Sequence, residues 1–194
     1  GRIVPIFKGG DPDDMERYRP ITILPIFSKV VEKVIAERLT KYLDEQEILM
    51  TNQHGFRKGR NTTTLVRDVV ERITDALDKK ESTVLTMCDL SKAFDVLPKD
   101  ILLEKMDFYG IRGVALNLID SYLSGRSQIT QIGNEKSHIC KLPEIGCPQG
   151  AILSPLIFII AVSDIPSCTS AYIGQYADDT SLIVSGKTNE NLMK

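Results

Sequence analysis

The feature that most constrains the fold is a short turn between two strand-like segments late in the sequence. Residues 171–176 and 180–184 are mostly apolar or aromatic, and only Ala177, Asp178 and Asp179 separate them. Strands joined so closely pair as an antiparallel hairpin, because a parallel pairing needs a crossover of about a dozen residues or more. The sequence therefore predicts an antiparallel sheet with two adjacent carboxylates at the tip of a hairpin.

The rest of the chain mixes helical and strand patterns without a regular alternation of the two. Apolar side chains at helical spacing predict helices over 27–43 (with Ser28 as a possible N-cap), 62–77, 98–109, 113–123 and 154–165. Strand patterns cover 1–7, a buried strand at 83–88, and a hairpin of 126–132 and 136–142 with a two-residue turn at 133–134. Such a mixture predicts the α+β fold class.

Composition excludes several classes of protein. With 194 residues, 42% hydrophobic and 26% charged, the chain has the profile of one globular domain or of two lobes that share a core. The apolar stretch 152–162 is far shorter than the roughly 20 residues of a membrane span, so no membrane partner is expected. The net charge of -2 does not indicate a nucleic-acid partner, so any polyanion must meet a local basic patch. The four cysteines have neither zinc-site nor disulfide spacing and are interpreted as free thiols.

A third carboxylate accompanies the two at the hairpin. Asp89 ends the strand pattern of 83–88, and if that strand pairs with the hairpin, then Asp89, Asp178 and Asp179 converge. Clustered oxygen ligands without His or Cys suit Mg²⁺ or Mn²⁺. Two such ions about 3.5–4 Å apart promote in-line phosphoryl transfer. The alternative is a solvated turn, because aspartate is common in turns for backbone reasons.

Three motifs occur in an order that resembles the core of reverse transcriptases. They are DLSKAFD at 89–95, CPQGAILSP at 147–155 and YADD at 176–179. Two further regions are similar to the fingers of the non-LTR, LINE-type retrotransposon branch: YRPITILP with FSKVVEK at 18–33, and QHGFRKGR at 53–60. The resemblance extends over essentially the whole chain and implies a right-hand polymerase with fingers and an antiparallel palm sheet.

The resemblance also implies roles for individual residues at the metal site. Asp89 and Asp178 would be the principal ligands of two Mg²⁺ ions, Asp179 would lie beside them, and the backbone of Leu90 would also reach a metal. Mn²⁺ is a possible substitute. The expected partners are an RNA template, a DNA primer and a dNTP, and the oligomeric state is unknown.

The nucleotide pocket that the resemblance implies consists of Lys8, Arg19, Phe94, Gln149 and Gly150. Lys8 and Arg19 would neutralise triphosphate charge, and the ring of Phe94 would lie under the sugar. Taken alone, Lys8 could instead belong to a turn, Arg19 to a charged surface and Phe94 to the core.

A basic loop between two predicted helices is the candidate template contact. Arg57, Lys58 and Arg60 supply three positive charges within four residues and would bind template phosphates in a salt-dependent way. A solvated loop is the alternative interpretation. His54 and His138 stand alone in the sequence, so neither is expected to be a metal ligand or a general base.

The resemblance further divides the chain into parts of the polymerase. It implies fingers at 1–82, a palm strand and turn at 83–97, intervening helices and a fingers hairpin at 98–145, and palm with the Asp-Asp hairpin at 146–194. The thumb of such enzymes is missing from this sequence, so the expectation is a fragment of a longer polyprotein that acts in the nucleus and cytoplasm. The expected function is RNA-directed DNA polymerase, with two rivals: an inactive nucleic-acid-binding relic and a palm-type nucleotidyl cyclase.

Overall fold

The computed structural model describes residues 1–90 and 92–188, which form two compact units. The larger unit comprises residues 1–45 and 92–160, and the smaller unit comprises the described residues from 46 to 90 and from 161 to 188. Each unit is therefore built from two separate stretches of the chain. The part boundaries predicted from the resemblance are not tested by this division and stay predictions, and residues 189–194 of the last part lie outside the described residues.

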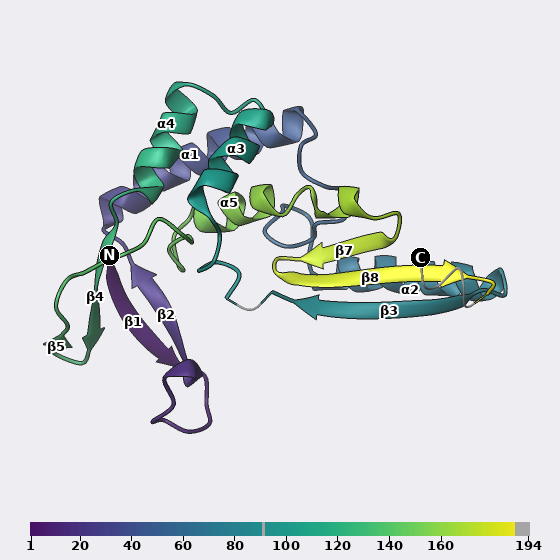
Figure 1. Cartoon of the computed structure of the whole chain (residues 1–194), viewed down its shortest axis with the longest axis horizontal. Helices are drawn as coiled ribbons and strands as arrows, with labels where there is room; N and C mark the ends of the chain where they lie inside the picture. Colours follow the sequence, from purple (N-terminus) through teal and green to yellow (C-terminus); the bar gives the residue numbers. More distant parts are fainter. Residues whose placement is uncertain (91, 189–194) are drawn as a thin grey trace. The chain divides into compact units, whose positions relative to one another are not determined.

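The larger unit contains a twisted sheet built around the first strand of the chain (Figure 1). Its strand order is β2-β1-β4-β5, and β6 also pairs with β4. The strands are β1 (Arg2–Phe7), β2 (Tyr18–Ile23), β4 (Ser127–Ile132), β5 (Glu135–Lys136) and β6 (Cys140–Lys141). The β1 and β2 strands are antiparallel, whereas β1 and β4 are parallel. A short 3-10 helix, η1 (Met15–Arg17), precedes β2.

Four helices supply the core of the larger unit (Figure 1). They are α1 (Ile26–Glu45), α3 (Lys99–Phe108), α4 (Val114–Leu123) and α5 (Ser154–Ala161). The first three bury apolar side chains at helical spacing, and nearly the whole of α5 is buried because its sequence is apolar on every side. The hydroxyl of Tyr42 on α1 donates a hydrogen bond to the carbonyl of Tyr109, 2.9 Å away, just after α3.

The smaller unit is a three-stranded antiparallel sheet with a helix on one face (Figure 1). The strand order is β3 (Ser82–Asp89), β8 (Asp179–Gly186) and β7 (Tyr172–Tyr176), and the helix is α2 (Thr62–Asp78). Asn61 caps α2, because its side chain accepts from Thr64 N while the Thr64 side chain returns a contact to Asn61 N. Gly174 lets Leu65 of α2 approach β7, since a Cβ at position 174 would lie 2.6 Å from the Leu65 side chain. Another 3-10 helix, η2 (Ile165–Cys168), leads into β7.

Most predicted elements are confirmed, and a few differ in detail. The Gly133-Asn134 turn is present, with Ile132 paired to Glu135. Helix α1 begins at Ile26, so Ser28 lies inside the helix and is not its N-cap. Helix α5 ends at Ala161 rather than at residue 165, and strand β2 is not among the predicted elements.

One prediction about burial is wrong. The strand over 83–88 was expected to be buried, yet Val84, Leu85 and Met87 of β3 are 45%, 42% and 76% exposed. The physical reason is that β3 is an edge strand, paired with β8 on one side only. Its apolar composition therefore does not indicate a central position in the sheet.

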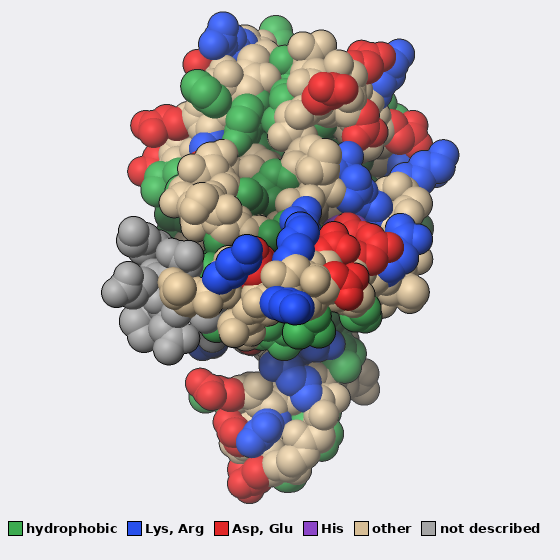
Figure 2. Space-filling view, turned by 90° about the vertical axis from the view of Figure 1, so that its right-hand side faces the viewer, with side chains coloured by type: hydrophobic (Ala, Val, Ile, Leu, Met, Phe, Trp, Pro, Cys, Tyr) green, Lys and Arg blue, Asp and Glu red, His purple; other side chains and the backbone are tan. Residues whose placement is uncertain are grey.

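The surface carries both signs of charge side by side. Figure 2 shows lysine and arginine side chains next to aspartate and glutamate side chains on one face, in keeping with the net charge of -2. Within residues 1–90 and 92–188, no helix combines the length and apolar character that crossing a membrane requires.

Candidate active site

The carboxylate hairpin forms as the sequence predicts. Tyr176 pairs with Asp179, so β7 and β8 are joined by a loop of only two residues, Ala177 and Asp178. The third predicted carboxylate also arrives at this point, because β3 pairs antiparallel with β8 in a register that sets Asp89 opposite Asp179. Backbone pairing thus brings all three predicted residues to one end of one sheet.

The register distinguishes the two carboxylates of the hairpin. Directly opposite residues in an antiparallel pair have Cα atoms about 4.5–5.5 Å apart and side chains on the same face. Asp89 and Asp179 meet this condition, whereas Asp178 stands in the loop. The assignment of Asp89 and Asp178 as principal ligands stays a prediction.

The donor atoms at this end of the sheet are of the kind that a hard divalent cation prefers. Asp89 and Asp179 are exposed and Asp178 is half-buried, so their carboxylates are open to an ion from solvent. In the described part of the chain, no three His, Cys, Asp or Glu side chains are gathered closely enough to hold a metal. The ligand chemistry and the backbone register therefore fit a divalent ion, while the side chains do not form a closed cluster. Leu90, which follows β3, is 40% exposed, and its predicted backbone contact with metal is untested.

The five predicted nucleotide residues belong to the larger unit. Lys8 follows β1 and is exposed, with its Nζ 3.3 Å from the carbonyl oxygen of Glu16, to which it donates. Arg19 on β2 is also exposed and is paired in register with Ile6 of β1. Both cations thus lie at the same end of the β1–β2 pair, Arg19 within β2 and Lys8 just after β1. Their contact with a triphosphate stays a prediction.

Gln149 and Gly150 lie in a turn that packs against β2. The carbonyl of Gln149 accepts a 2.8 Å hydrogen bond from Thr22 N, and Gly150 has a φ of 97°, where glycine is favoured. The Gln149 side chain is also held, because Nε2 donates to both carboxylate oxygens of Asp95 at 3.0 Å. The structure therefore fixes the amide that the resemblance places in a nucleotide pocket.

Phe94 is fixed both by packing of its ring and by a hydrogen bond to its backbone carbonyl. Its ring stacks on Phe158 of α5 with centroids 4.7 Å apart, and its carbonyl accepts a 2.7 Å hydrogen bond from Cys147 N. Gly146 makes this possible, since a Cβ there would lie 2.7 Å from the Phe94 carbonyl oxygen. The half-buried ring is compatible with both interpretations of Phe94, core packing and sugar contact.

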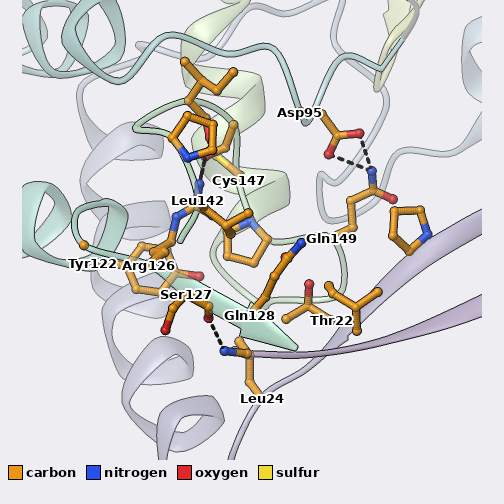
Figure 3. A pocket seen from close by; sticks show the side chains of 18 of the residues that line it. Thr22, Leu24, Asp95, Tyr122, Arg126, Ser127, Gln128, Leu142, Cys147 and Gln149 are labelled. Carbon is orange, nitrogen blue, oxygen red and sulfur yellow. Dashed lines mark hydrogen bonds between the residues drawn. The ribbon is translucent and has the colours of Figure 1, made fainter. Parts of the chain in front are cut away.

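A cavity of about 610 Å³ opens beside this turn in the larger unit (Figure 3). Thr22, Asp95, Tyr122 and Gln149 line it together with the buried thiol of Cys147, whose pKa is raised to about 12 by burial. Of the five predicted nucleotide residues, only Gln149 is in the lining. Cys147 is therefore a neutral wall of the cavity at physiological pH.

The two arginines of the predicted template loop donate hydrogen bonds to backbone carbonyls of the segment that precedes it. Arg57 donates to the carbonyl of Met50 at 2.6 Å, and Arg60 donates to the carbonyl of Thr51. Lys58 is exposed. Both arginines thus shape the loop, and the predicted contact with template phosphates is untested.

Sequence reasoning missed three side chains that hold these elements in place. Gln53 contacts the turn of the carboxylate hairpin, Asp95 holds Gln149, and the buried Glu32 of α1 accepts from Ile152 N at 2.7 Å. A lone Gln, Asp or Glu carries no sequence pattern that identifies its distant partner. The one local indication is Gly55, two residues after Gln53, because an isolated glycine can mark a close approach of another backbone segment.

The family model and two similar curated proteins that match this chain are all reverse transcriptases or RNA-directed DNA polymerases. A family model described as "Reverse transcriptase (RNA-dependent DNA polymerase)" matches residues 6–193. The chain is 34% identical over 199 residues to the "Probable RNA-directed DNA polymerase from transposon BS" of Drosophila melanogaster, which covers 94% of this chain and 21% of that protein. It is 31% identical over 195 residues to the "RNA-directed DNA polymerase from mobile element jockey" of the same species, covering 96% and 21%. The chain thus spans about a fifth of the length of these relatives.

Solved structures share the fold at low sequence identity. Apo telomerase from Candida tropicalis gives a TM-score of 0.70 at 12% identity, covering 100% of this chain and 40% of that chain. A chain of a partial Cas6-RT-Cas1--Cas2 complex gives 0.50 at 22% identity, covering 97% and 30%. The predicted α+β polymerase fold with an antiparallel carboxylate-bearing sheet is confirmed.

Proposed function

This chain belongs to the reverse transcriptase family, in its non-LTR retrotransposon branch, and from that membership we propose that it forms the nucleotidyl-transfer centre of an RNA-directed DNA polymerase. The observation that carries the proposal is the register of the smaller unit. It sets Asp89 opposite Asp179 at the strand end where the two-residue loop presents Asp178. Three carboxylates at one end of one sheet offer the oxygen donors that a hard divalent cation prefers.

The reaction adds a deoxynucleotide to a primer. The oxygen of the primer 3′-hydroxyl forms a bond to the α-phosphorus of a dNTP while the bond to the pyrophosphate oxygen breaks, and the hydroxyl proton is lost. The family uses divalent metal, and we propose two Mg²⁺ ions, with Mn²⁺ as a substitute. When bound, they neutralise charge on the attacking and leaving oxygens. Asp89, Asp178 and Asp179 would hold them, with the Leu90 carbonyl as a further oxygen donor.

The larger unit would bind the nucleotide. Lys8 and Arg19 offer exposed cations on one strand pair for the triphosphate. Gln149, held by Asp95, and Gly150 would contact the nucleotide, and the ring of Phe94 would lie under its sugar. Exposed Lys58, with Arg57 and Arg60, would meet the phosphates of an RNA template. We also propose that the parent protein acts in the nucleus and cytoplasm.

The test is primer extension by the full-length polymerase that contains this chain, with RNA and DNA templates assayed separately. Asp178→Asn should lower kcat by at least about 100-fold while the fold is kept, because the amide has a similar volume without the charge that holds the cation. Asp78→Asn is the matched control, since Asp78 is an exposed carboxylate at the end of α2 in the same unit. It should retain activity.

The outcomes separate the proposal from its rivals. An inactive nucleic-acid-binding relic would bind primer-template without extending it. Neither the RNA nor the DNA template would support extension, by the wild type or by either variant. A cyclase would consume nucleotide without any need for a template. An unchanged rate for Asp178→Asn at saturating Mg²⁺ would contradict the metal assignment.

A further inference from the structure

The tip of the carboxylate hairpin has a backbone conformation that needs support. Ala177, the first of the two loop residues, has a φ of 57° and is 7% exposed. A side chain other than glycine rarely adopts this left-handed conformation unless its surroundings hold it there. Because Asp178 and Asp179 follow directly, whatever holds Ala177 also sets where these carboxylates begin.

One buried amide contacts both backbone polar groups of Ala177. Gln53 is 3% exposed, and its Oε1 accepts from Ala177 N at 3.1 Å and from Gly55 N at 2.8 Å. Its Nε2 donates to the carbonyl of Ala177 at 3.4 Å. The side chain therefore grips the first loop residue from outside the hairpin.

The backbone of the same segment approaches the turn closely. A Cβ at Gly55 would lie 2.2 Å from Ala177 N and 2.9 Å from Ala177 Cα. Both contacts are to backbone, which cannot move aside as a flexible side chain would. Gly55 is thus required for the approach that lets Gln53 reach the loop.

Backbone hydrogen bonds to β7 fix the position of Gln53 along the hairpin. His54 N donates to the carbonyl of Gln175 at 2.7 Å, and Gln175 N donates to the carbonyl of Asn52 at 2.9 Å. Gln53 and Gln175 form a parallel bridge. Residues 52–55 therefore extend the sheet by a short pairing along β7, in a fixed register with the loop.

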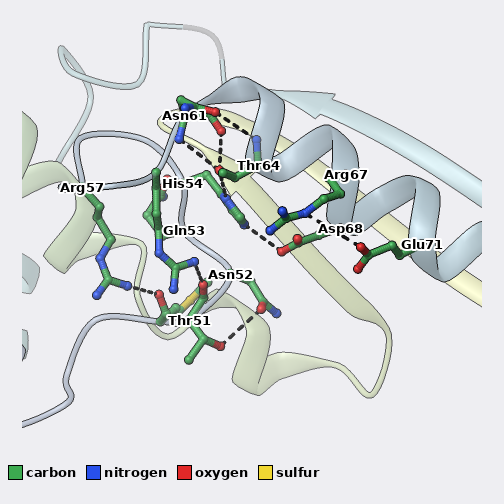
Figure 4. A network of polar contacts seen from close by, with 12 residues as sticks. Thr51, Asn52, Gln53, His54, Arg57, Asn61, Thr64, Arg67, Asp68 and Glu71 are labelled. Carbon is green, nitrogen blue, oxygen red and sulfur yellow. Dashed lines mark hydrogen bonds and ion pairs between the residues drawn. The ribbon is translucent and has the colours of Figure 1, made fainter.

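The segment is also tied to helix α2 (Figure 4). The buried His54 ring places Nδ1 2.7 Å from Thr64 Oγ1 and Nε2 3.2 Å from Asp68 Oδ2. His54 is 2% exposed, so the imidazole side of both contacts is buried. The residue that directly follows Gln53 is thus anchored to the helix that packs on the sheet.

We propose that Gln53 is a positioning residue for the metal-binding carboxylates: its amide holds the Ala177 backbone so that Asp178 and Asp179 are presented to divalent cations in a preset arrangement. This inference rests on the proposed function of the three carboxylates. Groups that orient metal ligands typically change metal affinity or activity by about 10–100-fold when they are removed. A role in folding alone would affect stability and leave metal affinity unchanged.

The experiment measures Mn²⁺ binding by electron paramagnetic resonance, together with primer extension, on the full-length polymerase. Gln53→Met keeps the length of the side chain and removes its hydrogen bonds. It should weaken Mn²⁺ binding about 10-fold or more and lower kcat, while the KM for primer-template stays the same. The matched control is Gln175→Met, because Gln175 is 0% exposed in the same sheet and its amide donates to Thr180 Oγ1 rather than to the loop. This control should lower the melting temperature and keep Mn²⁺ affinity.

A second variant covers the case in which Gln53→Met does not fold. Gln53→Glu keeps an oxygen that can accept from Ala177 N and Gly55 N, and burial favours the neutral acid, whose hydroxyl can donate to the Ala177 carbonyl as the amide does. This variant should fold and bind Mn²⁺ within about threefold of the wild type. The inference is overturned if Gln53→Met folds with unchanged Mn²⁺ affinity, if Gln175→Met loses as much affinity, or if a folded Gln53→Glu protein loses it.

Failure of the inference can be told apart from failure of the proposed function. Asp178→Asn in the same Mn²⁺ titration reports on the carboxylates directly. If this variant binds Mn²⁺ like the wild type, the proposed metal site is wrong. If it loses Mn²⁺ while Gln53→Met keeps it, the metal site stands and the positioning role of Gln53 is refuted.

Discussion

The buried carboxylate of Glu32 gives a prediction whose size follows from the structure. Glu32 on α1 is 2% exposed, and its Oε2 accepts from Ile152 N at 2.7 Å and from Leu153 N at 3.4 Å. These amides lie just before the first turn of α5, where a helix has backbone N–H groups without partners of its own. Glu32→Ala would leave both without this acceptor. The loop that carries Gln149 and Gly150 would then lose its link to α1.

The magnitude is dominated by the shorter hydrogen bond. Leaving a buried N–H unsatisfied costs about 1–3 kcal/mol. The Ile152 N–H is only partly buried and the buried Leu153 N–H is bonded at 3.4 Å, so neither contributes the upper value. Part of this is offset because Glu32→Ala no longer buries a polar group whose Oε1 has no hydrogen-bond partner among the described residues. We expect a net local destabilisation of about 2 kcal/mol, which corresponds to a roughly 30-fold change in an opening equilibrium.

Hydrogen exchange of individual amides is the assay. In Glu32→Ala the amides of Ile152 and Leu153 should exchange about 30-fold faster than in the wild type. Glu32→Gln keeps an acceptor oxygen and should show a smaller effect, and Glu37→Ala, an exposed position on the same helix, should show none. A change below about threefold at Ile152 in Glu32→Ala would refute the reasoning, because the shorter bond would then contribute almost nothing.

Two further predictions concern a possible sugar contact and a buried histidine. Phe94→Val should raise rNTP use relative to dNTP in the full-length polymerase; if Phe94 only packs on Phe158, both substrates will suffer alike and the melting temperature alone will fall. Burial lowers the pKa of His54 below its ordinary 6.5, and the nearby Asp68 carboxylate only partly offsets this. The unfolded chain thus binds the proton more readily, so stability is fully present above about pH 6.5 and is lost as pH falls towards the lowered pKa. Urea unfolding against pH should show this slope, and His54→Gln should flatten it; an equal slope in the variant would assign the effect to other groups.

Local patterns predicted the carboxylate hairpin and the helices well. The hairpin was accessible because β7, its two-residue loop and β8 are contiguous, so no distant partner had to be known. The pairing of β3 with β8 was predicted only as a condition, and the register that sets Asp89 opposite Asp179 is not encoded in either strand alone. The burial of β3 was mispredicted, because an apolar strand reads the same at the edge of a sheet and at its centre.

The supporting side chains could not be predicted for a different reason. Gln53 and Ala177 are separated by 124 residues, and a single amide has no periodicity that would connect it to its partner. Glu32 lies in a helix whose neighbouring positions are mostly exposed, so its burial breaks the local pattern. Residues of this kind become visible only once backbone segments from distant parts of the chain have been placed together.

The interleaving of the two units has a consequence for how the protein is made. The larger unit needs residues 1–45 and 92–160, and the smaller unit needs residues on both sides of that second stretch. During synthesis, the ribosome therefore releases α2 and β3 long before β7 and β8 exist to pair with them. Non-local pairing of this kind is slow and leaves strand edges open in the meantime. We expect nascent chains halted after about residue 130 to be protected by chaperones, and the three carboxylates to meet only in the last stage of folding.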